Sequence, residues 1–240
     1  MKGLPGFGSC ARCPYQGTGP PVPCWDCASP QLAWEPSPRC EVCDHPLAAG
    51  RACGNYWCHR EDRAFDLVWA MAAHRAVLRS VIARCKYRGA REWAVVLGRL
   101  VAGYLDRHAP WFEEFEVVTA CPGRPTPERP WDHMAAILSA AAEASSVWPW
   151  DLGCVVKTSP TAALMRRGSG EARRLWAACD LRPALAVPAP ELVHDRQILV
   201  VDDVFTDGST LREVARVLRA AGATGVSGLI IARQTWRSLV

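Results

Sequence analysis

The residues with the clearest chemical potential lie between positions 198 and 211, in the sequence ILVVDDVFTDGSTL. An apolar, β-branched run typical of a buried strand ends in two adjacent carboxylates, Asp202 and Asp203. A short turn and a helical pattern follow at once. Carboxylates at a strand end can accept hydrogen bonds from ribose hydroxyls, and N–H groups at a helix N-terminus can bind a phosphate. The order of these parts predicts a ribose-phosphate site.

The turn itself combines small and hydroxyl-bearing side chains, and its residues are Thr206, Asp207, Gly208, Ser209 and Thr210. One alternative is a buried strand followed by an ordinary capped helix. Another is a Mg²⁺ site for phosphoryl transfer at the two acids. We favour the ribose-phosphate site because the acid pair, Gly208 and two threonines would otherwise have to coincide by chance. Folds of the phosphoryl-transfer class also distribute their parts over separate strands.

Cysteine is concentrated at the other end of the chain, where eight of the 12 cysteines lie within the first 60 residues. They form four close pairs: Cys10/Cys13, Cys24/Cys27, Cys40/Cys43 and Cys53/Cys58. Three pairs have the C-x-x-C spacing that lets two thiolates bind one tetrahedral metal ion. We therefore predict two structural Zn²⁺ sites with four cysteines each, the simplest grouping being the first four and the last four.

Other assignments of the cysteines remain open at this point. A cross-braced grouping is also compatible with the spacing, and disulfides or an iron–sulfur cluster are the competing chemistries. We expect a reducing compartment, which disfavours disulfides. His45 and His59 flank the second set, and we expect both to be solvated loop residues rather than ligands.

Composition bounds the class of protein. The 240 residues suffice for one α/β domain and a small module, and a net charge of +4 does not by itself imply a nucleic-acid partner. The sequence has no apolar run of membrane-spanning length and no signal-peptide core, so we expect a cytoplasmic protein without membrane insertion. The first 60 residues hold nine of 19 prolines and seven of 18 glycines. We therefore predict a Cys-rich module at 1–60 and a second domain at 61–240.

Strand and helix patterns alternate through the second domain. We expect strands within 65–73, 115–120, 154–157, 198–201 and 226–232, and helices over 75–86, 92–106, 127–144 and from 211 to Gly222. This alternation predicts an α/β fold with a parallel sheet. Ligands of such sheets bind beyond the carboxyl ends of the strands, where the acid pair falls.

The motifs together resemble a known family. The acid pair and its turn resemble the phosphoribosyl-pyrophosphate (PRPP) motif of type I phosphoribosyltransferases. With the cysteine pairs and the segment CKYRG, which contains Lys86, nearly the whole chain resembles the ComF-like (GntX-like) family. That resemblance implies a type I phosphoribosyltransferase-like domain behind a double zinc ribbon, and a role in competence and DNA uptake.

The resemblance also implies roles for individual residues. Asp202 and Asp203 would hold the ribose hydroxyls, directly or through Mg²⁺, and the turn of 206–210 would hold the 5′-phosphate. Arg129 and Lys86 are candidates for contacting the pyrophosphate. The sequence departs from the family at Pro130, Leu164 and Asp207, where the family has glycine, glutamine and an uncharged residue. These departures concern catalysis rather than the fold.

A second class of function is a non-enzymatic interaction protein that contacts single-stranded DNA or competence proteins. Six basic residues lie between positions 75 and 91, and the Cys-rich module holds the aromatic residues Trp25, Trp34, Tyr56 and Trp57. Exposed aromatics beside cations suit stacking on single-stranded nucleic acid. Against this function, the module has a net charge of only +1. The sequence predicts neither the acceptor substrate nor the oligomeric state.

Overall fold

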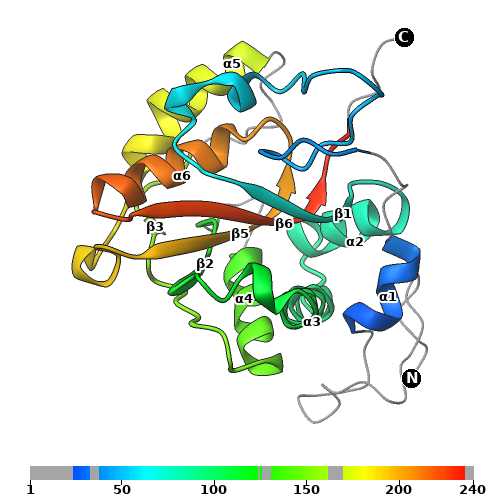
Figure 1. Cartoon of the computed structure of the whole chain (residues 1–240). Helices are drawn as coiled ribbons and strands as arrows, with labels where there is room; N and C mark the ends of the chain where they lie inside the picture. Colours follow the sequence, from blue (N-terminus) through cyan, green and yellow to red (C-terminus); the bar gives the residue numbers. More distant parts are fainter. Residues whose placement is uncertain (1–23, 33–37, 124, 126–130, 162–169, 236–240) are drawn as a thin grey trace.

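The computed structural model describes residues 24–32, 38–123, 125, 131–161 and 170–235. Within these residues, four parallel strands form one sheet in the order β1-β6-β5-β2 (Figure 1). The strands are β1 (Val68–Ala73), β2 (Val117–Ala120), β5 (Gln197–Phe205) and β6 (Gly225–Arg233). The predicted α/β fold with a parallel sheet is confirmed. The strand that carries the acid pair, β5, is one of the two central strands.

Helices cover both faces of this sheet. The described helices are α1 (Trp25–Leu32), α2 (Ala76–Tyr87), α3 (Glu92–Arg107), α4 (His133–Ala144), α5 (Gly170–Trp176) and α6 (Ser209–Ala220). Figure 1 shows α3 and α4 on one side of the sheet, with α5 and α6 on the other. A sheet covered on both faces has no solvent-facing side, which is the usual situation for parallel strands.

Alternate residues of β5 contribute to two separate cores. Ile198 and Val200 pack with the apolar side of α6, whereas Leu199 and Val201 pack with α3 and α4. All four side chains are fully buried. Because successive strand residues point to opposite faces, a strand buried on both sides needs an uninterrupted apolar run. This requirement explains the ILVV sequence that precedes the acids.

Short elements connect the main ones. Two brief antiparallel strands, β3 (Val156–Lys157) and β4 (Leu185–Ala186), pair with each other, and a π-helical turn at Ala177–Leu181 continues α5. Single 3₁₀ turns lie at Tyr56–His59, Glu61–Arg63, Ala109–Trp111, Arg182–Ala184 and Pro190–Leu192.

Several element boundaries differ from the sequence prediction. The strand expected over 198–201 runs from Gln197 to Phe205, so the acid pair lies within it and not beyond its end. The helix expected from 127 begins at His133, because the side chain of Asp132 caps it by accepting the N–H groups of Met134 and Ala135 at 3.0 and 3.1 Å. The strand expected within 65–73 begins at Val68. The predicted end of α6 is confirmed, since Gly222 follows it with a φ of +101°.

The Cys-rich segment contacts the rest of the protein closely. Trp25, Ala28 and Leu32 of α1 belong to the same core as α3 and α4, while Cys43 and Trp57 belong to the core on the α6 side. The boundary at residue 60 stays a prediction. Among the described residues, no helix is both long enough and apolar enough to cross a membrane.

Candidate functional site

The acid pair lies at a step in the edge of the sheet. Strand β2 ends its pairing with β5 at Ala120 and Val201, whereas β5 and β6 stay paired up to Phe205 and Arg233. Asp202 and Asp203 therefore belong to the strand itself, just past the carboxyl end of β2. Their neighbouring positions direct the two carboxylates to opposite faces of the sheet.

Asp203 is held by two cationic or polar groups from different helices. Its Oδ2 accepts a hydrogen bond from Nζ of Lys86 at 2.6 Å and another from Nε2 of His133 at 2.9 Å. Lys86 lies in the last turn of α2, and His133 is the first residue of α4. The Asp203 side chain is only 3% exposed. Burial opposes ionisation of this carboxyl, but the Lys86 ammonium and the His133 hydrogen bond outweigh burial and lower its pKa.

Asp202 has the opposite character. Burial, followed by the negative charge of Asp203, raises the pKa of Asp202 to about 7. Its Oδ1 accepts the backbone N–H of Asp203 at 2.9 Å. Near neutral pH the pair therefore combines an ionised carboxylate with a neighbour that exchanges its proton in the physiological range. A carboxyl with this pKa can accept a hydrogen bond from a hydroxyl and can also exchange a proton near neutral pH.

The turn after β5 depends on a glycine. Gly208 has a φ of +91°, and a Cβ at this position would lie 2.6 Å from Cζ of Phe205. Any other residue would suffer both backbone strain and a steric clash. Gly208 also precedes the first residue of α6, so the turn leads directly into a helix N-terminus. The expected strand–turn–helix order is present.

The turn's own carboxylate occupies part of this N-terminus. Oδ1 of Asp207 accepts the backbone N–H of Ser209 at 3.0 Å, and its Oδ2 pairs with Nε of Arg173 at 3.2 Å. The Asp207 residue is 6% exposed. A phosphate at the start of α6 would therefore compete with, or repel, this carboxylate. The Arg173 guanidinium offsets part of its charge.

The hydroxyl groups of the turn have different environments. Thr206 Oγ1 donates to Oε1 of Gln234 at 3.2 Å, and Oγ of the buried Ser209 accepts Nε1–H of Trp57 at 3.5 Å. Thr210 is half-buried in the first turn of α6. The turn is therefore anchored at both ends by other parts of the chain.

The structure brings together some of the predicted residues and adds others. Lys86 reaches the acid pair, whereas Arg129, Pro130 and Leu164 lie outside the described residues. Sequence reasoning did not select His133 or Arg173 as site residues. No local signal singles out His133, because its contact with Asp203 depends on how α4 approaches the end of β5.

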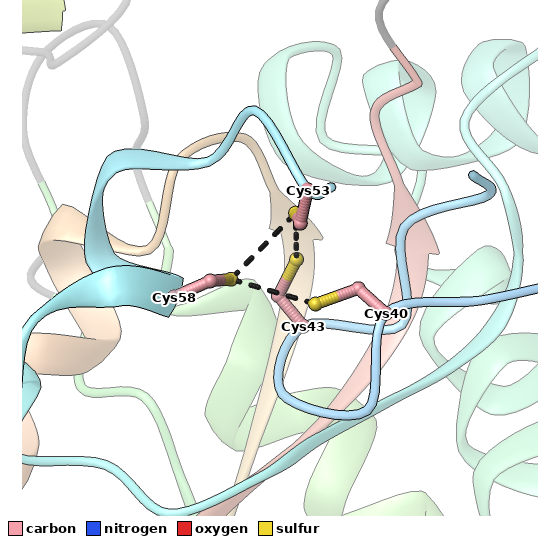
Figure 2. A group of neighbouring side chains, drawn as sticks. All are labelled: Cys40, Cys43, Cys53 and Cys58. Carbon is pink, nitrogen blue, oxygen red and sulfur yellow. Dashed lines mark hydrogen bonds between the residues drawn. The ribbon is translucent and has the colours of Figure 1, made fainter. Parts of the chain in front are cut away.

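Four cysteine sulfurs of the Cys-rich segment lie close together. Sγ atoms of Cys40, Cys43, Cys53 and Cys58 all lie within 4.8 Å of one another, and we call these residues the four-cysteine cluster (Figure 2). The separations are 3.7 Å between Cys40 and Cys58, 3.6 Å between Cys43 and Cys53, and 3.8 Å between Cys53 and Cys58. A zinc ion bonded tetrahedrally to four sulfurs at about 2.3 Å separates them by about 3.8 Å. The donor set thus fits Zn²⁺ in both chemistry and size.

Disulfides do not explain this cluster. A disulfide requires sulfurs about 2.05 Å apart, and all four residues are free cysteines. Hydrogen bonds from Cys53 and Cys58 lower the pKa of Cys43, while the hydrogen bond with Cys43 raises the pKa of Cys53 to about 12. Zinc binding would replace these shared protons, because the metal binds thiolates. Four thiolates leave no open position, so the metal's contribution would be structural.

The first four cysteines are only partly described. Cys10 and Cys13 lie outside the described residues, Cys24 is buried, and Cys27 is half-buried within α1. The first zinc site stays a prediction. The expectation of solvated histidines is wrong for His45, which is buried with Nδ1 2.6 Å from the carbonyl oxygen of Pro46, whereas His59 is exposed.

Aromatic side chains of the Cys-rich segment are mostly buried. Trp25 and Trp57 are 8% and 5% exposed, so neither is available for stacking at the surface. Trp25 contacts Tyr104 edge-on, and Trp57 lies beneath the guanidinium of Arg212. Tyr56 remains exposed, whereas Trp34 lies outside the described residues. The aromatics therefore serve packing more than surface stacking.

No protein-family model matches this sequence, and no curated protein matches it. Among solved structures, the chain is similar to an allosteric regulatory enzyme of purine biosynthesis, with 28% identity over 48% of this chain and 21% of that chain, at a TM-score of 0.29. It is also similar to glutamine PRPP amidotransferase from B. subtilis, with 27% identity over 48% of this chain and 22% of that one, at a TM-score of 0.30. The chain thus spans about a fifth of the length of these two enzymes.

Proposed function

We propose that this protein binds PRPP or a related ribose phosphate at the carboxyl end of β5, and that it transfers the phosphoribosyl group. The observation that carries the proposal is the acid pair at the step beside β2, followed directly by the Gly208 turn and the N-terminus of α6. Ribose hydroxyls need acceptors, and a 5′-phosphate needs N–H donors at a distance of one sugar ring. Both kinds of group are present in consecutive residues.

The charges around the acid pair suit a reaction in which pyrophosphate leaves. The Lys86 ammonium is half-buried beside Asp203, so its field acts with little screening. A cation near the leaving anion lowers the barrier to its departure, and ionised Asp203 would stabilise positive charge that develops on the ribose. Mg²⁺, bound with the substrate, would neutralise the pyrophosphate, and Asp202 and Asp203 are the carboxylates that would hold it.

Asp207 makes binding weaker than in a turn with a neutral residue at this position. Its carboxylate occupies the Ser209 N–H that a phosphate would use. Binding of the 5′-phosphate through this N–H then requires the Asp207 side chain to leave Ser209, whether or not it stays paired with Arg173. We therefore expect a modest affinity, supplied mainly by the acid pair and the remaining N–H groups of α6.

Isothermal calorimetry with PRPP and Mg²⁺ tests the binding proposal. The wild-type chain should bind, while Thr210→Val and Asp203→Asn should each weaken binding at least tenfold. Circular dichroism must show that both variants remain folded. Asp180→Asn, which changes an exposed acid away from the site, is the matched control and should bind as the wild type does. Absence of binding by the wild type would defeat the proposal.

Turnover is a separate measurement, because binding a substrate does not by itself accelerate its reaction. Release of pyrophosphate from PRPP should be followed with single purine and pyrimidine bases as acceptors. We expect release that depends on one acceptor and is lost in Asp202→Asn. If the protein binds PRPP but releases pyrophosphate no faster than the uncatalysed reaction with any acceptor, it is a ribose-phosphate binding protein and not a transferase.

A ComF-like role in DNA uptake is a second candidate. One observation favours direct contact with single-stranded DNA: exposed arginines follow one another along and after α2, next to Lys86, namely Arg79, Arg84, Arg88 and Arg91. Tyr87, which is 47% exposed, lies among them. Cations beside an exposed ring can bind phosphates and stack on bases.

Fluorescence anisotropy with a labelled oligonucleotide tests this candidate across a salt series. The double variant Arg84→Gln/Arg88→Gln should bind more weakly and with a shallower salt slope, since each lost phosphate contact reduces that slope by about 0.7 for single strands. Arg107→Gln, an exposed arginine in the last turn of α3, is the control. Undetectable binding at low salt would remove this candidate.

A further inference from the structure

One buried arginine joins the four-cysteine cluster to the turn at the acid site. Arg233, the last residue of β6, is completely buried. Its Nε donates to the carbonyl oxygen of Cys43 at 3.0 Å, and its Nη2 lies 3.5 Å from Cys43 Sγ. Its Nη1 donates to the carbonyl oxygens of Phe205 at 3.1 Å and Thr206 at 2.8 Å. A single guanidinium thus bonds a predicted metal ligand and the first residues of the turn.

The same guanidinium also controls the packing of the turn. Its carbon lies 4.5 Å from the centre of the Phe205 ring, and this ring contacts Gly208, where no Cβ would fit. The planar fork of arginine has fixed donor directions, so a shift of Cys43 would be transmitted to Phe205 and Thr206. Lysine has one nitrogen and cannot reproduce these bonds at the same time.

A second connection runs from Trp57, the neighbour of Cys58. The Trp57 indole Nε1–H donates to Ser209 Oγ at 3.5 Å, and the Arg212 guanidinium lies 4.0 Å from the centre of its ring. Ser209 and Arg212 belong to the first turn of α6. The cluster therefore contacts the turn from both sides: Arg233 before Gly208 and Trp57 after it.

We propose that Arg233 and Trp57 are positioning residues through which a metal ion in the four-cysteine cluster sets the geometry of the turn at 206–210, and with it the affinity for a phosphate. The effect on phosphate rests on the proposed function, whereas the link between metal and turn does not. A bound Zn²⁺ holds four sulfurs in one geometry, so the Cys43 carbonyl that Arg233 bonds is held too. Without metal, the two short cysteine-bearing segments lose their common anchor.

The coupling is reciprocal by thermodynamic necessity. If metal in the cluster tightens phosphate binding by a given factor, then phosphate tightens metal binding by the same factor. This relation supplies a readout that is independent of catalysis: the affinity for zinc, measured by competition with a chelator, in the presence and absence of ribose 5-phosphate.

Hydrogen–deuterium exchange of the full chain tests the link itself. The zinc-loaded and chelator-treated proteins are compared at the amides of residues 205–211 and, as an internal reference, at those of α3. Removal of zinc should speed exchange at 205–211 at least tenfold and leave the interior of α3 unchanged. Equal exchange at 205–211 in both forms, with zinc loss verified by metal analysis, would overturn the proposal.

Variants of the two connecting residues test the consequence for binding. Zinc-loaded Arg233→Lys and Trp57→Phe should bind ribose 5-phosphate about tenfold more weakly, which is about 1.4 kcal/mol, while binding free ribose as the wild type does. In both variants ribose 5-phosphate should no longer tighten zinc binding. Arg99→Lys is the control for general destabilisation, because Arg99 is also a buried arginine but lies in α3.

The possible outcomes separate the two proposals. Should the wild type bind no ribose 5-phosphate, the proposed function fails, and the exchange experiment still decides whether metal orders the turn. Should the wild type bind but Trp57→Phe and Arg233→Lys keep full affinity and full coupling to zinc, the positioning roles are wrong. If Arg233→Lys does not fold, Trp57→Phe carries the test alone.

Discussion

Replacing Asp202 by asparagine should stabilise the fold at and above neutral pH. In the folded protein the pKa of this carboxyl is about 7, compared with 3.8 for an ordinary aspartate, because burial and the charge of Asp203 oppose ionisation. A raised folded-state pKa favours folding only while the group is protonated. Its contribution is therefore complete below about pH 4 and is lost as the pH rises through about 7.

The magnitude follows from the two pKa values. A carboxyl whose pKa rises from 3.8 to about 7 costs the folded state about 4 kcal/mol once it is fully ionised. The asparagine side chain avoids this cost and can still accept the N–H of Asp203 through its Oδ1. The free energy of unfolding of the variant, minus that of the wild type, should rise by about 1.4 kcal/mol per pH unit between pH 5 and 7 and then level off.

Urea unfolding, followed by tryptophan fluorescence from pH 5 to 8.5, measures this difference. The cysteines of the four-cysteine cluster also respond to pH, but they do so in both proteins and cancel in the difference. Asp203→Asn is the contrasting variant, since it removes the partner of Lys86 and His133 and should destabilise the fold near neutral pH. A difference for Asp202→Asn that does not change with pH, or that falls as the pH rises, would refute the reasoning.

Three further predictions concern the same site. Gly208→Ala should lower the free energy of unfolding by roughly 1–3 kcal/mol, because of the positive φ and the contact with Phe205, and an unchanged urea midpoint would contradict this. Lys86→Met should cost about 3–5 kcal/mol by leaving Asp203 buried without its cation, and the double variant with Asp203→Asn should recover part of this loss. If the double variant is no more stable than the single one, the ion pair is not the cause. Asp207→Asn removes a charge from the phosphate position and should tighten ribose 5-phosphate binding at least tenfold in calorimetry, whereas weaker binding would show that the carboxylate assists the ligand.

The main elements could be predicted from local sequence because each has a strong local cause. The ILVV run, buried on both faces, and the apolar side of α6 follow directly from hydrophobic periodicity. The cysteine pairs likewise indicated metal-binding chemistry, since C-x-x-C spacing lets two thiolates converge. Which pairs come together stayed open in the sequence, and the structure groups Cys40/Cys43 with Cys53/Cys58. In each case the predictable part is encoded by residues that lie close together in the chain.

Contacts over long sequence distances were not predictable in this way. His133 meets Asp203 across 70 positions, and its role depends on the angle at which α4 approaches the end of β5. The inward turn of the Asp207 carboxylate depends on Arg173 and on the N-terminus of α6. No local pattern encodes such angles, because they result from packing of whole helices against the sheet.

The sequence by itself therefore determined the α/β class, the order of apolar run, acid pair, turn and helix, and the presence of cysteine pairs whose chemistry suits a metal ion. Tertiary structure alone decided that Lys86 and His133 share Asp203, that Trp57 is buried against α6, and that Arg233 bonds both Cys43 and the turn. The physical reason is the range of the interactions involved. Hydrophobic period, turn chemistry and ligand spacing act between near neighbours, whereas a buried charge finds its partners only after distant segments have packed together.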